Sequence, residues 1–317
     1  MTLRLSSMRK GSRRLAAVDV GTNTVRMLVV SETEEGFRPV IRMRRITGMG
    51  KALRETGAIG APELRASLDA LRDFRKELDR LGVVEYRACG TAALRESSNR
   101  EEFLAEAARA GIPVGIITAR EEARLTWEGI SGGGGTGDGT LLMDIGGGST
   151  EFIAGPGKRD FVSLPTGVVL LSASFPLSEP PRSWELSNLG HFLAERIEAG
   201  TDLWKRRRFR RMVGTAGTFT TLAALERRMR IYRPERIDGV RMTLAKVRRW
   251  EKRLAGMTEA ARLALPGMEK GRERYIVFGV CQAVAAMERF RIEDLTISDA
   301  GLLEGILRGL CGRKGRG

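Results

Sequence analysis

The segment Leu141-Leu142-Met143-Asp144-Ile145-Gly146-Gly147-Gly148-Ser149-Thr150-Glu151 places a carboxylate directly before three consecutive glycines. An apolar run brings Asp144 to its end, the glycines turn the chain, and a second apolar run follows. Glycine has no Cβ, so such a turn can adopt positive φ and present bare N–H groups to an anion. Ser149 and Thr150 add hydroxyl donors, and a carboxylate beside a phosphate loop suits a bridging divalent cation. Taken alone, the pattern is also compatible with a glycine-rich hairpin that only turns the chain.

A second copy of the pattern favours the phosphate-binding interpretation. Val18-Asp19-Val20-Gly21-Thr22-Asn23-Thr24 has the same order of apolar run, Asp, apolar residue, Gly and small polar residues. Two such hairpins in one chain predict a duplicated architecture whose two phosphate loops face each other. A third turn, which contains Gly214 and Thr215, leads from a predicted strand into a predicted helix and is a further candidate anion site.

Length and composition limit the class of protein. A chain of 317 residues can form two domains with hydrophobic cores. No apolar run approaches the ~18 residues that a membrane span needs. Residues 1–14 are basic without an apolar centre, so we expect a disordered tail rather than a secretory signal. Three widely spaced cysteines and one histidine disfavour a zinc site and fit a reducing cytoplasm. The cysteines are expected to be small core residues, and Cys89, next to the Gly90-Thr91 turn, is the candidate for a reactive thiol.

The positive charge is concentrated in one segment. The chain carries a formal charge of +15, and residues 205–253 hold 17 Lys/Arg and 4 Asp/Glu, a net charge of +13. Such a surface attracts polyanions such as polyphosphate, nucleic acid or an anionic membrane, unless it is simply a solvated face. Aromatic residues are sparse there, which makes nucleic acid the weaker partner. No membrane partner is expected.

The order of predicted elements indicates an α/β fold. Strands are expected at residues 15–20, 25–31 and 37–47, followed by a helix at residues 62–81 and a strand at residues 83–89. Asn99 and Glu102 predict a capping box for a helix at residues 100–110. A strand at residues 112–118 and a helix at residues 120–130 follow. After a glycine-rich connector at residues 131–140, the pattern restarts and repeats the first half in outline, with added helices up to residue 310.

Seven segments together resemble the exopolyphosphatase/guanosine pentaphosphate phosphohydrolase (Ppx/GppA) family. They are AAVDVGTNTVRMLV, ACGTAALRESSN, ITAREEARLTWEG, LLMDIGGGSTEF, VGTAGTFTTLA, GRERYIVFG and LTISDAGLLEGIL. The resemblance implies a two-domain actin/Hsp70/sugar-kinase-like fold, a duplicated ribonuclease H-like architecture, with the active site in the cleft between the domains. Domain I would comprise residues 1–120 with the C-terminal helix 301–317 packed back on it, and domain II residues 121–300. The chain resembles the short form, without a C-terminal histidine–aspartate helical domain.

The resemblance also implies roles for individual residues. Glu122 would be the general base that activates water, and Arg95 would contact phosphate. Asp144 would hold Mg²⁺ or Mn²⁺, with Glu151 as a supporting ligand. Two loops would clamp the terminal phosphoryl group, namely Gly21, Thr22, Asn23 and Thr24 in the first and Gly146, Gly147, Gly148, Ser149 and Thr150 in the second. Arg274 stands where the family often has an acidic residue, so no family role is expected there.

General chemistry agrees with these roles. Phosphoryl transfer requires positioning and neutralisation of charge, which N–H groups, an arginine and a metal supply. Glu122 can alternatively be a first-turn glutamate favoured by the helix dipole, and Glu121 is expected to be its solvated neighbour. Asp19 is a candidate second metal-side or water-orienting carboxylate, or else a residue that hydrogen-bonds its own turn.

Three functions follow as hypotheses. The first is Mg²⁺-dependent hydrolysis of the terminal phosphoanhydride of inorganic polyphosphate, and the second is removal of the 5′-phosphate from guanosine pentaphosphate. The third is a non-catalytic polyphosphate- or nucleotide-binding or sensing protein, since fold alone does not determine function. The family also leads us to expect a cytoplasmic homodimer. Chain-length preference, the physiological metal and the role of residues 205–253 remain open at the level of sequence.

Overall fold

The computed structural model describes residues 2–4, 12–34, 36–132, 139–155 and 160–311. The chain divides into two compact units, Met1–Gly133 with Gly301–Gly317, and Gly134–Ala300. The expected boundary at residue 120 falls in the first turn of helix α5 (Ala119–Ser131), whereas the units divide after this helix, because α5 packs against α13 (Leu302–Cys311). The return of the C-terminal helix to the first unit agrees with that expectation. No helix in the described part of the chain is long and apolar enough to cross a membrane.

The first unit is built on a six-stranded sheet with the order β1-β4-β3-β2-β5-β6. Its strands are β1 (Thr2–Arg4), β2 (Arg14–Val20), β3 (Thr24–Thr33), β4 (Gly36–Ile46), β5 (Glu85–Gly90) and β6 (Val114–Ile116). Strands β2, β3 and β4 form an antiparallel meander, and β5 and β6 continue the sheet parallel to β2. Strand β1 pairs with β4. The expected disorder of residues 1–14 is therefore wrong for β1 and for Arg14, while residues 5–11 lie outside the described residues.

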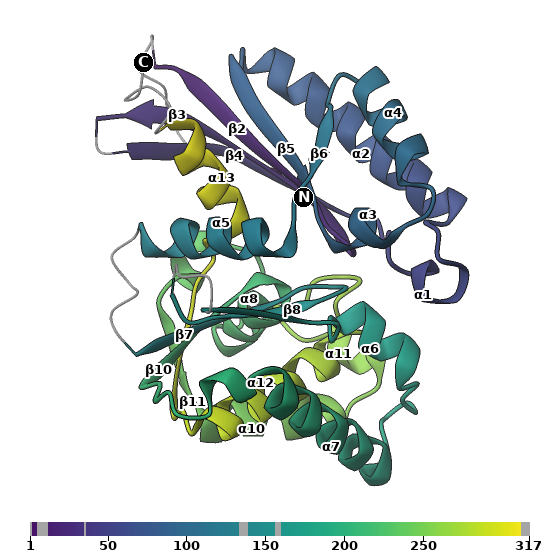
Figure 1. Cartoon of the computed structure of the whole chain (residues 1–317), viewed down its shortest axis with the longest axis vertical. Coiled ribbons are helices and arrows are strands. Elements are labelled where there is room, and N and C mark those ends of the chain that lie inside the picture. Colours follow the sequence, from purple (N-terminus) through teal and green to yellow (C-terminus); the bar gives the residue numbers. More distant parts are fainter. Residues whose placement is uncertain (1, 5–11, 35, 133–138, 156–159, 312–317) are drawn as a thin grey trace. The chain divides into compact units, whose positions relative to one another are not determined.

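The side chains of β2 alternate between two apolar layers, as the period of a strand requires. Ala16, Val18 and Val20 face one core, and Leu15 and Ala17 face the other. Figure 1 shows α2 and α4 along the first face and α5 and α13 along the second. Asp19 shares the second face with Leu15 and Ala17. The remaining helices of the unit are α1 (Leu53–Thr56), α2 (Ala61–Arg80), α3 (Ala92–Glu96) and α4 (Arg100–Arg109).

The second unit repeats this plan on a sheet with the order β11-β12-β10-β7-β8-β9. Its strands are β7 (Thr140–Ile145), β8 (Thr150–Ile153), β9 (Phe161–Leu164), β10 (Arg211–Thr215), β11 (Val240–Thr243) and β12 (Asp294–Ile297). Strands β7, β8 and β9 form a second antiparallel meander, and β10 and β12 run parallel to β7. The duplicated α/β architecture predicted from the two Asp-x-Gly hairpins is confirmed. Residues 133–138 of the expected connector lie outside the described residues.

The helices of the second unit gather around one large apolar core. They are α6 (Val168–Ser174), α7 (Ser183–Gly200), the 3₁₀ turn η1 (Asp202–Trp204), α8 (Ala216–Glu226), α9 (Pro234–Ile237), α10 (Leu244–Ala255), α11 (Glu259–Leu263) and α12 (Ile276–Phe290). Strand β11 and helix α11 were not predicted, because each is too short to show a periodic pattern.

The predicted capping box at Asn99 is wrong. The Asn99 side chain does not cap α4. Its Oδ1 instead accepts from the N–H of Ile59 at 2.9 Å and its Nδ2 donates to the carbonyl of Ile59 at 3.0 Å. The Asn99 amide thus hydrogen-bonds to Ile59, 40 residues away, instead of to the N-terminus of α4 as the local sequence pattern predicted.

Candidate active site

The first hairpin turn is held from behind by the segment of residues 47–50. The carbonyl of Thr22 accepts from Gly50 N–H at 2.8 Å, and the carbonyl of Asn23 accepts from the N–H groups of Thr47 and Gly48 at 3.0 and 3.1 Å. In a trans peptide the C=O and the following N–H point in opposite directions. The N–H groups of Asn23 and Thr24 therefore point away from this supporting segment, in the orientation that an anion site requires.

Asp19 lies at the end of β2, beside this turn. Its Oδ2 accepts from Nε of Arg26, its cross-strand neighbour on β3, at 2.9 Å. Asp19 is 3% exposed, and its Oδ1 has no hydrogen-bond partner among the residues that the structure describes. One carboxylate oxygen is thus paired with a guanidinium, while the other retains its capacity to accept a water proton or a cation.

Helix α5 brings Glu122 to Arg95. Thr118 caps the helix by accepting from Glu121 N–H at 3.1 Å, so Glu122 falls in the first turn. Arg95 Nη1 donates to Glu122 Oε2 at 2.8 Å and to the carbonyl of Ile117 at 3.0 Å. Glu121 is instead paired with Arg87 at 2.7 Å. The structure therefore separates the two adjacent glutamates and gives only Glu122 the Arg95 partner.

The parallel strands explain why these residues lie at one edge. Asp19, Arg95 and Glu122 follow or end the strands β2, β5 and β6, and parallel strands present their carboxyl ends on the same side of a sheet. Cys89 on β5 is the register partner of Asp19. The pKa of the Cys89 thiol is raised to about 12, chiefly by burial and to a smaller extent by the Asp19, Glu121 and Glu122 carboxylates, against the lowering effect of Arg87. Cys89 is thus a buried core residue, as expected, and its raised pKa argues against the alternative of a reactive thiol, since the reactive form is the thiolate.

The glycine loop of the second unit repeats the arrangement of the first. The carbonyls of Gly146, Gly147 and Gly148 accept from the N–H groups of Val168 (3.0 Å), Val169 (2.9 Å) and Gly167 (3.2 Å), respectively, so the loop caps the start of α6. By the same peptide geometry, the N–H groups of Gly147, Gly148 and Ser149 point away from α6. Three successive N–H groups on one side of a turn form a concave anion site.

Gly167 allows the start of α6 to approach the glycine loop closely. This residue was not identified from the sequence. A Cβ at this position would collide with the backbone of Gly147 and Gly148. A glycine directly before a predicted helix was the available signal, but its contact with the loop could not be read from the pattern. Thr150 is fully buried and its hydroxyl lies 2.6 Å from Gln282 Oε1, so that side chain supports the loop from the core.

Polar side chains form a row across the second sheet. Asp144 is the register partner of Thr215 on β10 and of Glu151 on β8. Register partners present their side chains on the same face of a sheet, so Asp144 and Glu151 are neighbours. Ser163 Oγ donates to Glu151 Oε1 at 2.7 Å, and Thr215 Oγ1 donates to the carbonyl of Ala300 at 2.8 Å. Two neighbouring carboxylates fit Mg²⁺, which takes one or two carboxylates together with phosphate oxygens.

The turn after β10 is made by Ala216 rather than by a glycine. Ala216 has φ +65°, a left-handed conformation that is uncommon outside glycine, and Gly217 lies within α8. Gly214 is required instead for packing, because a Cβ there would overlap the Phe219 ring. The glycine turn predicted at this position is thus corrected, while Thr215 keeps its place beside Asp144.

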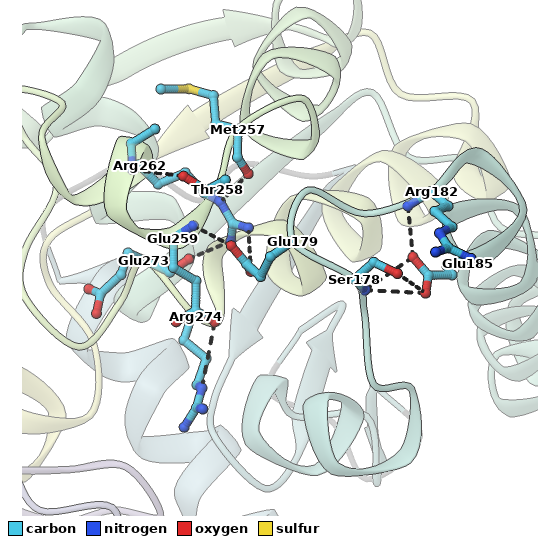
Figure 2. Close-up of polar contacts among 11 residues, drawn as sticks. Ser178, Glu179, Arg182, Glu185, Met257, Thr258, Glu259, Arg262, Glu273 and Arg274 are labelled. Carbon is cyan, nitrogen blue, oxygen red and sulfur yellow. Dashed lines mark hydrogen bonds and ion pairs between the residues drawn. The ribbon is translucent and has the colours of Figure 1, made fainter.

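The buried Arg262 holds the segment of residues 272–274, which contacts the start of α8. Figure 2 shows Arg262 donating to the carbonyls of Met257 (3.1 Å) and Glu273 (2.6 Å) and pairing with Glu179 Oε1 (3.1 Å). Next to Glu273, Arg272 donates to the carbonyl of Gly217 at 2.8 Å, in the first turn of α8.

Arg274, which departs from the family pattern, has a different partner from Arg272. It pairs with Glu259 of α11 at 3.7 Å (Figure 2). Within residues 272–274, Arg272 therefore contacts the start of α8, whereas Arg274 forms a surface ion pair.

Each unit thus carries its own set of predicted site residues. The first unit brings together the first loop, Asp19, Arg95 and Glu122. The second brings together the glycine loop, Asp144, Glu151 and Thr215.

Comparison with known proteins shows one family throughout. The model of the Ppx/GppA phosphatase family matches residues 28–314. Exopolyphosphatase 2 of Mycobacterium tuberculosis is 33% identical over 317 residues, which cover 94% of this chain and 99% of the relative. Among solved structures, an exopolyphosphatase from Cytophaga hutchinsonii aligns with a TM-score of 0.87 at 27% identity, covering 94% of this chain and 97% of its own. A Ppx/GppA family member from Aquifex aeolicus aligns with a TM-score of 0.82 at 28% identity, covering 97% and 100%.

Proposed function

The chain belongs to the Ppx/GppA phosphatase family and is a hydrolase of phosphoanhydride bonds, and we propose that it hydrolyses the terminal phosphoanhydride of inorganic polyphosphate. The products are orthophosphate and a chain shorter by one phosphate. The names of the M. tuberculosis relative and the C. hutchinsonii structure support polyphosphate as the substrate class. The two backbone N–H arrays support a ligand that ends in a phosphoryl group.

The observation that carries the proposal is the Arg95–Glu122 pair in the first turn of α5. The guanidinium orients the Glu122 carboxylate, which acts as the acceptor of a proton from water. The water oxygen forms a bond to the terminal phosphorus, Glu122 takes the proton, and the bond from that phosphorus to the bridging oxygen breaks. General-base catalysis of this kind contributes roughly 10²- to 10⁴-fold to a rate.

The other residues stabilise charge. In each unit the backbone N–H groups of the loop are suitable donors for phosphoryl oxygens, on which negative charge accumulates in the transition state, and Arg95 adds a cationic donor in the first unit. Asp144 and Glu151 would hold Mg²⁺ or Mn²⁺. When bound, the cation would neutralise the phosphate oxygens as a Lewis acid.

The first prediction concerns Glu122. With long-chain polyphosphate and Mg²⁺, Glu122→Gln should lower the rate of orthophosphate release by roughly 10²- to 10⁴-fold, because glutamine cannot accept the proton. Glu121→Gln is the matched control: it removes a glutamate from the same helical turn, paired with Arg87, and should retain nearly the wild-type rate. A chelator should abolish release by the wild-type protein.

Two results would contradict the proposal. Wild-type turnover by Glu122→Gln would remove this residue from the mechanism. A higher kcat/KM for guanosine pentaphosphate than for polyphosphate, measured in parallel, would transfer the activity to the nucleotide.

A further inference from the structure

A strongly basic loop, residues 205–210, lies at the amino-terminal ends of the parallel strands of the second sheet. We call this end of the sheet its amino-terminal edge; Asp144 and the glycine loop lie at the opposite, carboxyl-terminal edge. Residues 205–210 lead directly into Arg211, the first residue of β10. Arg210 N–H donates to the carbonyl of Gly139 at 2.8 Å, and Arg211 Nε donates to Thr140 Oγ1 at 2.9 Å, where the parallel strand β7 begins. Asp144 and Thr215 lie at the other ends of these strands. The length of β10, roughly 13 Å, separates the two edges.

The end of α8 returns to this same edge. The helix leaves the carboxyl end of β10 and runs back to Glu226, whose carboxylate accepts from Lys246 Nζ at 2.7 Å. Lys246 lies in the first turn of α10, and Leu244 N–H donates to the carbonyl of Glu293 at 2.9 Å, directly before β12 begins. Arg227 and Arg228, which directly follow α8, therefore lie on the amino-terminal side of the sheet, whereas Tyr232 already donates to Asp299, beyond the carboxyl end of β12.

Several cations at this edge are not neutralised. Four basic residues of the region form ion pairs, and their acidic partners are Asp160, Asp202, Glu226 and Glu288. Five exposed arginines have no ion pair within the described ranges, although the exposed Glu293 and Asp294 also lie at this edge. We call these five the basal arginine surface: Arg206, Arg208, Arg210, Arg227 and Arg228.

The aromatic residues of the region are engaged elsewhere. Phe209 packs edge-on against Trp204 and Phe290 with ring centroids 6.0 and 5.3 Å apart, and Trp204 is buried. The Trp250 indole N–H donates to Glu226 at 3.0 Å. Nucleic-acid bases are held by stacking on exposed aromatic rings, whereas an inorganic polyanion needs only charge. The chemistry of this edge fits a linear phosphate chain.

We propose that the basal arginine surface is a second binding site for long-chain polyphosphate, separate from the edge that carries Asp144 and the glycine loop. The inference rests on the proposed function and adds an exosite to it. A chain held at this surface stays near the protein after each cleavage, so its free end returns at a high effective concentration. Tripolyphosphate is too short to span the length of β10 and gains nothing from such a site.

The second prediction tests the exosite with matched triple variants. Arg206→Gln/Arg208→Gln/Arg210→Gln should raise the KM for long-chain polyphosphate about fivefold or more and leave kcat and KM for tripolyphosphate unchanged. The slope of log KM against log salt concentration should fall by about 2, from about 0.7 per lost contact on a single-stranded polyanion. The control Arg65→Gln/Arg72→Gln/Lys76→Gln removes three exposed cations from α2 and should leave both substrates unaffected.

Three outcomes would overturn the exosite. These are an unchanged KM for the long chain in the Arg206 triple variant, an equal rise in KM for both substrates, and an equal effect of the α2 control. Binding of labelled long-chain polyphosphate in chelator provides a readout that does not depend on turnover. If the wild-type protein hydrolysed no polyphosphate, the proposed function would fail, and weaker binding by the triple variant would still support the exosite. If single-stranded RNA of equal charge displaced polyphosphate from the wild-type protein at lower concentration, the surface would belong to nucleic acid.

Discussion

At the residue scale, the cross-strand partners of Asp19 and Asp144 carry opposite charges. Asp19 and Asp144 occupy the same place in their meanders, yet Asp19 faces Arg26 across the strands and Asp144 faces Glu151. A guanidinium beside a carboxylate repels a cation, whereas a second carboxylate attracts one. The cross-strand partners, Arg26 and Glu151, therefore favour a metal site at Asp144 over one at Asp19. We expect Asp19 instead to orient a water molecule or the Arg26 side chain.

Glu251 provides a prediction about pH at the same scale. Burial raises the pKa of this carboxyl, although the Cys281 thiol donates to it and lowers the pKa in part. A raised pKa means that the folded state binds more protons than the unfolded state. The stability contributed by Glu251 is therefore complete below the unfolded value of about 4.3 and is lost as the pH rises through the raised pKa.

The third prediction is that Glu251→Gln removes this loss. The free energy of unfolding of the variant should rise relative to wild type as the pH is taken from about 4 to about 7. Urea denaturation at a series of pH values measures the difference. Glu235→Gln, at an exposed position, should give a difference that does not change with pH. A Glu251→Gln curve parallel to wild type at every pH would show that the burial of this carboxyl is without effect.

At the element scale, two glycine contacts set the positions of the elements that carry the candidate site. A Cβ at Gly305 of α13 would collide with the backbone of Leu125 in α5, so the two helices cross at close range and α13 supports the helix that carries Glu122. In the second unit, Gly167 brings the start of α6 against the glycine loop. In both cases a missing side chain, rather than a polar group, determines where the functional element lies.

The fourth prediction follows from Gly167. Gly167→Ala should displace the glycine loop and lower kcat/KM for polyphosphate by about 10²-fold, since a misplacement of about 1 Å can cost this much. Overpacking should lower the stability by about 1–3 kcal/mol. Gly190→Ala is the control on α7, where an added Cβ meets no atom within 4 Å, so activity should be unchanged. Equal activity of the two variants would show that the loop tolerates the shift.

At the scale of the whole molecule, the chain leaves its first unit and later returns to complete it. Helix α13 contributes Leu302, Leu303, Ile306, Leu307 and Leu310 to the core behind β2, and these side chains are at most 5% exposed. Arg42 of β4 also pairs with Glu304 of α13 at 2.7 Å. The first sheet therefore depends on residues almost 300 positions away in sequence, whereas the second core is formed by one continuous stretch of chain.

The fifth prediction uses this difference. Leu307→Ala should destabilise the protein by about 2–5 kcal/mol, as expected for a fully buried leucine. Hydrogen exchange should increase in β2, β3 and β5 while β7, β8 and β10 keep their protection, because the cores are separate. Leu263→Ala, at a 40% exposed position, should change neither set. Equal loss of protection in both sheets would show that the two units unfold together.

Local features of the sequence determined much of this protein. The Asp-x-Gly hairpins, the apolar runs and the helical spacing predicted two meanders and most of the helices, because turns and periodicity depend on near neighbours in the chain. The same reasoning failed at Asn99 and Ala216, where a distant segment or the surrounding packing overrides the local preference.

Tertiary structure determined how those features are used. The loop N–H groups face outward because Gly50 and Gly167 hold the carbonyls from behind, and Glu122 differs from Glu121 because Arg95 reaches only one of them. The charge of +13 in residues 205–253 was evident from sequence, but the position of Arg206, Arg208 and Arg210 at the end of the sheet away from Asp144 follows from strand direction. Each of these outcomes joins residues that are far apart in sequence, and only folding brings such residues within the few ångströms over which hydrogen bonds and steric contacts act.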